Sequence, residues 1–147
     1  MPFEFNKLNH RWNADPNDPY PSAQISGADV TVKFLLNIFL YPIFQEGETG
    51  SIIFKNCSKY RLGETNDEGW YLGQCRFSKL LPEWGEFYEL SGDKHLLDAP
   101  NDWQEIAQAP EAQRHYLFYF RDETFECVAD RWEFEESADN GLLKVKT

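Results

Sequence analysis

The sequence predicts a mainly β domain, either an antiparallel β-sandwich or an open curled barrel, with one short helix. Three observations support this class: several short stretches alternate apolar and polar residues, turn-forming residues separate them at fairly regular intervals, and only one stretch carries helix signals. A chain of 147 residues has the usual size of one domain, so we expect a single globular domain over residues 1–147.

The first half should contain an irregular lead-in followed by strands. Residues 13–22 hold three prolines among Asn and Asp residues, which is typical of extended or turn-rich backbone. From Val30 to Leu40 every second residue is apolar, which indicates a half-buried strand that ends near Pro42. Residues 51–60 carry apolar side chains on both faces, so we expect one strand in the centre of a sheet. Residues 61–69 have the composition of a loop, and residues 70–77 that of another strand.

The second half should contain a short strand, a short helix and a hairpin. The strand covers residues 86–90 and ends in a turn at residues 91–93. The helix begins near Asn101, which offers a cap followed by acidic residues, and it ends before Pro110. After Trp132 the chain becomes polar, so residues 133–147 should form a polar C-terminal segment in which residues 142–145 add a last edge strand or fray.

The hairpin should join residues 115–120 to residues 124–129. If Asp122 and Glu123 form a two-residue turn, Phe120 lies opposite Phe125. Both then point to the same face of the sheet, together with every second residue along the two strands. Asp-Glu is not a favoured hairpin turn, so a longer loop with a shifted register stays open.

The opening segment lacks the basic start and the continuous apolar stretch of a signal peptide, so we expect a cytoplasmic protein. No apolar run reaches the roughly 20 residues that a membrane helix needs, and we expect no membrane association. Cys57, Cys75 and Cys127 show no close spacing. We expect three reduced, mostly buried thiols, with no metal and no cofactor.

Negative charge is concentrated in two acidic blocks, residues 83–111 and residues 122–140. The chain has 25 acidic and 14 basic residues and a net charge of −11, which disfavours direct binding to nucleic acid or an anionic membrane. Each block holds eight acids and one basic residue, so each has a net charge of 1 − 8 = −7. The blocks are either solvated faces that protect edge strands or a surface matched to a basic partner protein.

On the second interpretation, aromatic anchors sit within a charged rim, as in many protein interfaces. The candidate partner-binding residues of the first block are Glu83, Trp84, Glu86, Tyr88, Glu89 and Asp93. Those of the second block are Asp122, Glu123, Glu126, Asp130 and Trp132.

The sequence contains no catalytic motif such as G-x-S-x-G, a Gly-rich phosphate loop or H-E-x-x-H, so we expect a protein that is not an enzyme. One catalytic combination stays open, a pair of carboxylates beside tryptophans, as in glycoside hydrolysis. Asp67 or Glu68 near Trp70 would supply one carboxylate, and Glu86 or Glu89 near Trp84 the other.

Two segments, KNCSKYRLGETNDEGWYLGQCRFSK at residues 55–79 and HYLFYFRDETFECVADRWEF at residues 115–134, resemble segments of small uncharacterised bacterial β-rich proteins, including immunity proteins of bacterial toxin systems. The resemblance implies a small acidic inhibitor that caps a basic toxin or nuclease domain, and it assigns no role to any single residue. We therefore predict a non-enzymatic acidic protein-binding module, present as a monomer or weak homodimer. The alternatives are a carbohydrate-binding or carbohydrate-processing β-sandwich and a structural subunit of a homo-oligomer.

Overall fold

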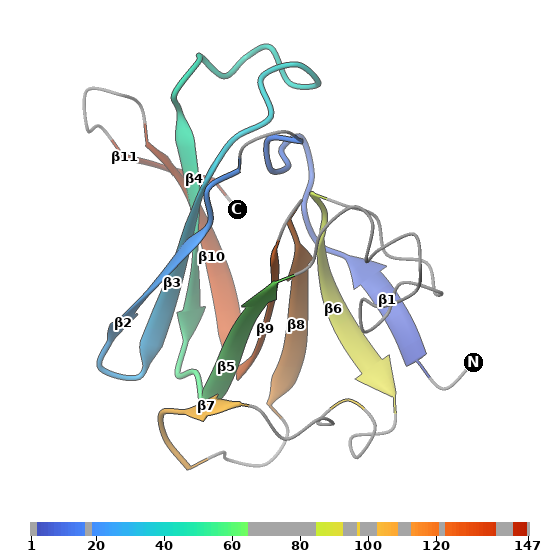
Figure 1. Cartoon of the computed structure of the whole chain (residues 1–147), viewed down its shortest axis with the longest axis vertical. Helices are drawn as coiled ribbons and strands as arrows, with labels where there is room; N and C mark the ends of the chain where they lie inside the picture. Colours follow the sequence, from blue (N-terminus) through green and yellow to red (C-terminus); the bar gives the residue numbers. More distant parts are fainter. Residues whose placement is uncertain are drawn as a thin grey trace.

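The protein is built mainly from β-strands, as predicted, arranged in two antiparallel sheets (Figure 1). The computed structural model describes residues 3–16, 19–64, 85–92, 97, 103–108, 113–120, 123–137 and 143–146. Sheet I contains, in spatial order, β1 (Phe3–Lys7), β6 (Phe87–Gly92), β8 (Arg114–Tyr119), β9 (Glu123–Ala129), β5 (Lys59–Glu64) and β7 (Gln104–Glu105). Sheet II contains β11 (Leu143–Lys146), β10 (Arg131–Ser137), β4 (Thr49–Lys55), β3 (Asp29–Leu35) and β2 (Ser22–Ser26).

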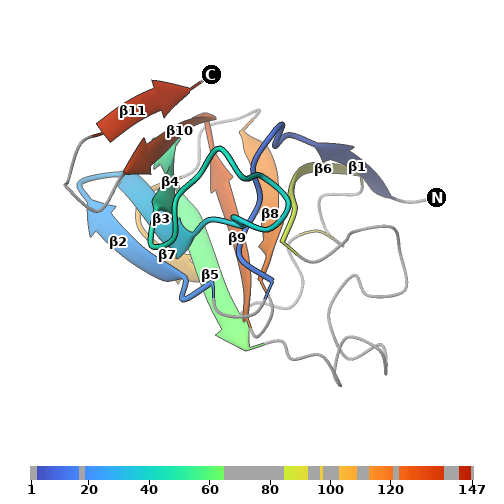
Figure 2. The same ribbon diagram turned by 90° about the horizontal axis from the view of Figure 1, so that it is seen from above.

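The two sheets face each other across one apolar core (Figure 2). Within the described residues they do not close into a barrel, because sheet I ends in the edge strands β1 and β7 and sheet II in β11 and β2. Alternation of apolar and polar residues explains the inner strands, since side chains two residues apart point to the same face. Val30, Val32 and Phe34 of β3 are fully buried, whereas Lys33 between them is exposed.

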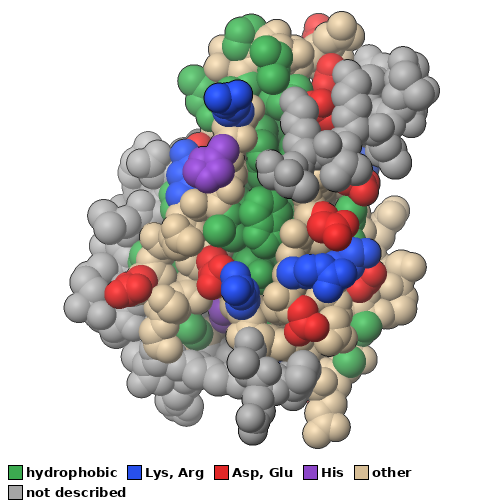
Figure 3. Space-filling view, turned by 180° about the vertical axis from the view of Figure 1, so that it is seen from behind, with side chains coloured by type: hydrophobic (Ala, Val, Ile, Leu, Met, Phe, Trp, Pro, Cys, Tyr) green, Lys and Arg blue, Asp and Glu red, His purple; other side chains and the backbone are tan. Residues whose placement is uncertain are grey.

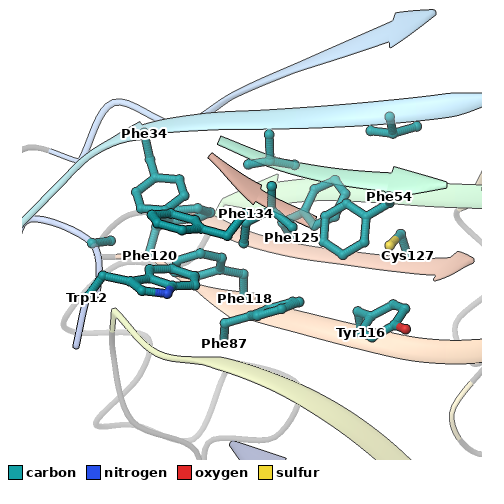
Figure 4. Packing of buried hydrophobic residues seen from close by; sticks show 14 of the residues in the cluster. Trp12, Phe34, Phe54, Phe87, Tyr116, Phe118, Phe120, Phe125, Cys127 and Phe134 are labelled. Atoms are coloured by element: carbon teal, nitrogen blue, oxygen red, sulfur yellow. The ribbon is translucent and has the colours of Figure 1, made fainter. Parts of the chain in front are cut away.

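Aromatic rings fill most of the core (Figure 4). Phe34 of sheet II lies 4.9 Å from Phe118 of sheet I, measured between ring centroids. Trp12, which lies between β1 and β2 just before the lead-in, enters the core and stacks on Phe134 with 4.1 Å between centroids and 4° between planes. Such pairs add about 0.5 to 1.5 kcal/mol each beyond the area that they bury, so one residue outside the strands helps to hold the sheets together.

The strand predicted from Val30 to Leu40 is shorter than expected. Strand β3 ends at Leu35, and Leu36 forms only an isolated bridge to Ala14. The side-chain oxygen of Asn37 then accepts the backbone N–H groups of Phe39 at 3.1 Å and Leu40 at 3.2 Å. This turn, which an Asn side chain favours, competes with strand pairing, and it directs the following apolar residues away from the core.

The single strand predicted over residues 51–60 is also wrong, because it is two strands in different sheets. Strand β4 is central in sheet II, as predicted, but it ends at Lys55, and β5 begins at Lys59 in sheet I. Asn56 between them has a left-handed backbone, with φ at 51°, which Asn tolerates better than most residues. The Asp29 carboxylate accepts the Asn56 N–H at 3.0 Å and the Lys55 ammonium at 3.2 Å. These contacts, the Asn56 amide above all, hold the pKa of Asp29 below its ordinary value.

The helix predicted from Asn101 is wrong for the described residues 103–108. Gln104 and Glu105 form β7, which pairs with β5. The next two backbone N–H groups donate to the carbonyl of Ser58 at 2.8 and 3.1 Å. A helix of little over two turns has little stability of its own. Hydrogen bonds to the edge of sheet I therefore determine the conformation of this segment. Residues 61–64, predicted as a loop, are part of β5, because they too pair with a strand of sheet I. The strand predicted at residues 70–77 lies outside the described residues.

The predicted hairpin is present as β8 and β9, with a register two residues from the predicted one. Phe118, rather than Phe120, lies opposite Phe125. A shift of two residues keeps every side chain on its predicted face, so Phe118 and Phe125 point into the main core as expected. Leu117 and Tyr119 lie on the other face, in a smaller buried cluster.

The chain stays in the core beyond Trp132, contrary to the predicted polar exit. Residues 131–137 form β10, which pairs along its length with β4 and buries Phe134. Trp132 and Phe134, two positions apart, lie on one face of this strand and keep it inward, together with the buried Glu136. Strand β11 pairs with β10 at the edge of sheet II, which confirms the predicted last edge strand.

Gly50 in β4 lies where the core leaves no room for a side chain. A Cβ atom there would lie 2.8 Å from Phe134 Cε1 and 3.0 Å from both Leu36 Cδ2 and Phe34 Cζ. We expect Gly50→Ala to lower the free energy of unfolding by about 2 kcal/mol, because overpacking strains a filled core. Gly63→Ala in β5 is the matched control, since nothing lies within 4 Å of its Cβ position. Urea denaturation of both variants checks this, and an equal loss in the two would contradict it.

Candidate functional site

Within the first acidic block, Glu86 is an internal anchor and not a surface contact. Its side chain is buried, and its carboxylate accepts hydrogen bonds from the amides of Asn9 at 2.5 Å and Asn13 at 2.9 Å. Lys7 lies 3.1 Å away and neutralises the charge. The structure therefore places Glu86, predicted as a partner contact, in the interior, where its carboxylate fixes the N-terminal segment.

Two other predicted contacts of this block are also engaged within the chain. Tyr88 is buried, with its ring 6.3 Å from that of Phe5 in an edge contact. Glu89 is half-buried and pairs with Arg114 at 3.3 Å. Tyr88 is thus a core residue rather than an interface anchor, which corrects the prediction.

The second block contains the most deeply buried carboxylate of the set. Glu126 is 3% exposed, and both its oxygens accept hydrogen bonds from the Arg61 guanidinium at 3.2 Å. His115 Nε2 lies 2.7 Å from Glu126 Oε2. Trp103 covers the cluster, with the Arg61 guanidinium carbon 3.8 Å from its ring centroid. Glu126, predicted as a partner contact, is thus buried beneath three neighbouring side chains and does not lie on the surface.

Asp130 and Glu123 keep some access to solvent. Asp130 is exposed and accepts hydrogen bonds from the amides of Asn56 and Gln113, both at 3.0 Å. These two donors, Asn56 first, hold the pKa of Asp130 below its ordinary value. Glu123 is half-buried at the start of β9. Among the described acidic residues predicted to meet a partner, Asp130 is thus the one that is fully on the surface.

Several predicted residues lie outside the described residues. They are Glu83, Trp84, Asp93, Asp122, the carbohydrate-site candidates Asp67, Glu68 and Trp70, and Cys75. Cys57 and Cys127 are free and buried, as predicted.

Trp132 lines a cleft of about 480 Å³ at the open side of the sandwich, which we call the aromatic cleft. Its apolar wall consists of Leu8, Trp12, Ile43, Phe44, Trp132 and Phe134. His10 and Arg11 complete the lining. Trp132 itself is half-buried and makes an edge contact with Phe87 at 5.1 Å between centroids. On one face of the molecule, hydrophobic side chains reach the surface beside a histidine and basic side chains (Figure 3).

Next to this cleft, the loop between β3 and β4 presents three large apolar side chains to solvent. Phe39, Leu40 and Ile43, which we call the apolar turn, are 71%, 59% and 67% exposed. The loop stands at the top of Figure 1, and its residue Ile43 also lines the aromatic cleft. Sequence reasoning placed Phe39 and Leu40 in a strand. The signals that mark the turn are Asn37 and Pro42, which interrupt the apolar run.

The described residues contain no group of three or more His, Cys, Asp or Glu side chains placed to hold a metal ion. No helix among them is long and apolar enough to cross a membrane. Comparison of the chain with protein-family models, with curated proteins and with solved structures finds no match. The candidate site therefore consists of the exposed apolar turn and the aromatic cleft beside it.

Proposed function

We propose that the protein is a non-enzymatic binding module that captures a basic partner protein, as an immunity-type inhibitor of a toxin or nuclease domain would. The observation that carries this proposal is the exposure of Phe39, Leu40 and Ile43 within five residues of one loop. Exposed apolar clusters of this kind mark interaction sites, because leaving them in water is unfavourable. A net charge of −11 makes a basic protein the partner that fits.

The two features have different roles in this proposal. The negative charge of the whole chain would attract a basic partner over distance and raise the association rate. The apolar turn would provide the anchor that slows dissociation, since buried apolar anchors dominate most interfaces. Exposed Glu46 lies three residues after Ile43 and supplies an acidic group near the turn. Glu86 and Glu126 are paired within the chain, so Glu46 takes the acidic role that the sequence predicts for them.

The variant Phe39→Ser with Ile43→Ser tests the anchor against the purified product of the gene immediately upstream, the position of a toxin gene in such pairs. We expect dissociation of the complex to become at least about tenfold faster, because two anchor side chains are lost. Biolayer interferometry measures this rate. Ile25→Ser in β2 is the matched control, as it removes an exposed apolar side chain elsewhere and should change nothing.

Three outcomes of this experiment contradict the proposal. The first is the absence of binding to the upstream product, and the second is an association rate that high salt does not lower. The third is a stable dimer of the free protein, measured by sedimentation over a range of concentrations, that the double variant abolishes. That result would assign the apolar turn to self-association.

A further inference from the structure

We propose that the aromatic cleft binds a small planar aromatic acid, a flat ring system that carries a carboxylate. This inference does not rest on the proposed protein partner and concerns the free protein. It follows from three features of the cleft: the character of its walls, the sign of the charge at its edge and the way in which the chain fixes the basic residues there.

The walls suit a flat ring. Trp12 and Phe134 stack on each other and give one wall an aromatic character, and Trp132, which is less buried, lies two residues from Phe134 on the same face of β10. Aromatic faces bind other rings by offset stacking or edge contacts. A volume of about 480 Å³ lies within the range of small-molecule pockets, which is enough for a fused two-ring compound. The half-buried indole of Trp132 leaves ring surface for a ligand to cover.

The charge at the cleft is opposite to that of the chain. Arg11 and His10 are exposed and are the polar lining residues, and no acidic residue belongs to the lining that the structure describes. A guanidinium binds a carboxylate through two parallel hydrogen bonds, a geometry that suits Arg better than Lys. On a protein with a net charge of −11, this local positive charge selects an anionic ligand where most of the surface would repel it.

The basic residues are held in place by a buried polar network. Asn9 donates to the carbonyl of Trp12 at 2.7 Å and accepts the backbone N–H of Phe87 at 2.9 Å. Glu86 binds the amides of Asn9 and Asn13. Between these anchors, Arg11 has a left-handed backbone with φ at 63°, which is strained for a residue other than glycine. The network thus fixes Arg11 at the cleft, and Glu86 is a positioning residue.

Isothermal titration calorimetry with 2-naphthoate and its neutral analogue 2-naphthalenemethanol tests the inference on the whole protein. We expect 2-naphthoate to bind with a stoichiometry of one and at least about fivefold more tightly than the alcohol, the size of an exposed charge interaction. Arg11→Asn should remove this preference, and Asn accepts the left-handed backbone. Arg11→Lys should keep most of it, and Trp132→Ala should weaken both compounds.

Lys33→Asn is the matched control, since it removes one positive charge from an exposed position on β3, outside the cleft lining. It should leave the affinity for 2-naphthoate unchanged. The inference is overturned if 2-naphthoate does not bind, if the alcohol binds equally well, or if Arg11→Asn keeps the preference. None of these results bears on capture of a protein partner, which is tested through Phe39 with a different binding assay.

Discussion

Glu126→Ala should lower the free energy of unfolding by about 3 to 5 kcal/mol, the cost of removing one partner from a buried ion pair. The change leaves the guanidinium of Arg61 and the ring of His115 without the carboxylate that both contact. The side chains of Arg61 and His115 are themselves nearly buried, and water cannot replace the lost hydrogen bonds at full strength. Urea denaturation followed by tryptophan fluorescence measures the loss.

Two further variants separate the buried charge from simple loss of packing. Glu126→Leu combined with Arg61→Leu removes both charges of the pair and should be less destabilising than Glu126→Ala alone. Glu89→Ala should cost less than about 1 kcal/mol, because its partner Arg114 is 61% exposed and water screens such pairs. Equal losses for Glu126→Ala and Glu89→Ala would show that burial of the ion pair has no effect.

The second large effect is expected at alkaline pH, where Tyr116 should destabilise the protein. Burial raises the pKa of Tyr116 to about 12, and the charge of Glu89 contributes. In the unfolded chain this phenol ionises near pH 10, whereas in the folded protein it stays neutral until about pH 12. Its contribution to stability is therefore complete below pH 10 and is lost as pH rises toward 12. The loss amounts to about 2 kcal/mol over these two pH units.

The free energy of unfolding of the wild type and of Tyr116→Phe, measured from pH 9 to pH 12, tests this expectation. The phenylalanine variant should lose about 2 kcal/mol less over this range, because it has no proton to release. Tyr20→Phe, at an exposed position, should follow the wild type. Parallel curves for the wild type and Tyr116→Phe would refute the assignment.

Faces of strands could be predicted from the sequence, whereas ends and registers could not. Val30, Phe118 and Phe125 point where their period-2 patterns place them, because that period is a property of the strand itself. The break at Asn56 was not predicted, since the apolar pattern continues through it. The left-handed backbone there depends on the Asp29 carboxylate, which lies 27 residues away in the sequence.

Two strands near the N-terminus were missed for a related reason. Strands β1 and β2 lie at sheet edges, and each has only five residues, so their short alternation gives a weak signal. Edge strands owe their conformation to pairing with a neighbour more than to burial of one face. Strand β1 pairs with β6, more than 80 residues further along the chain, and no local pattern carries that information.

The candidate site was predicted in part. Trp132 was singled out from the sequence and lines the aromatic cleft. The acidic blocks could be located in the sequence, but a count of charges does not show which carboxylates are paired. Glu86 pairs with Lys7 and Glu126 with Arg61, both from distant segments. The basic residues beside the cleft were not recognised. The only local signal was the pair Arg11 and Trp12 just before the Pro-rich lead-in.

The order of strands has a consequence for synthesis of the protein on the ribosome. In sheet II, β4 lies between β3 and β10, and β10 is translated long after β4, because residues 56–130 separate the two strands. The apolar face of the β2–β4 meander must therefore stay uncovered until β10 has emerged, since sheet I also needs β8 and β9. Such late closure through distant pairings slows folding and exposes sticky surface, which makes the nascent chain a natural client for chaperones.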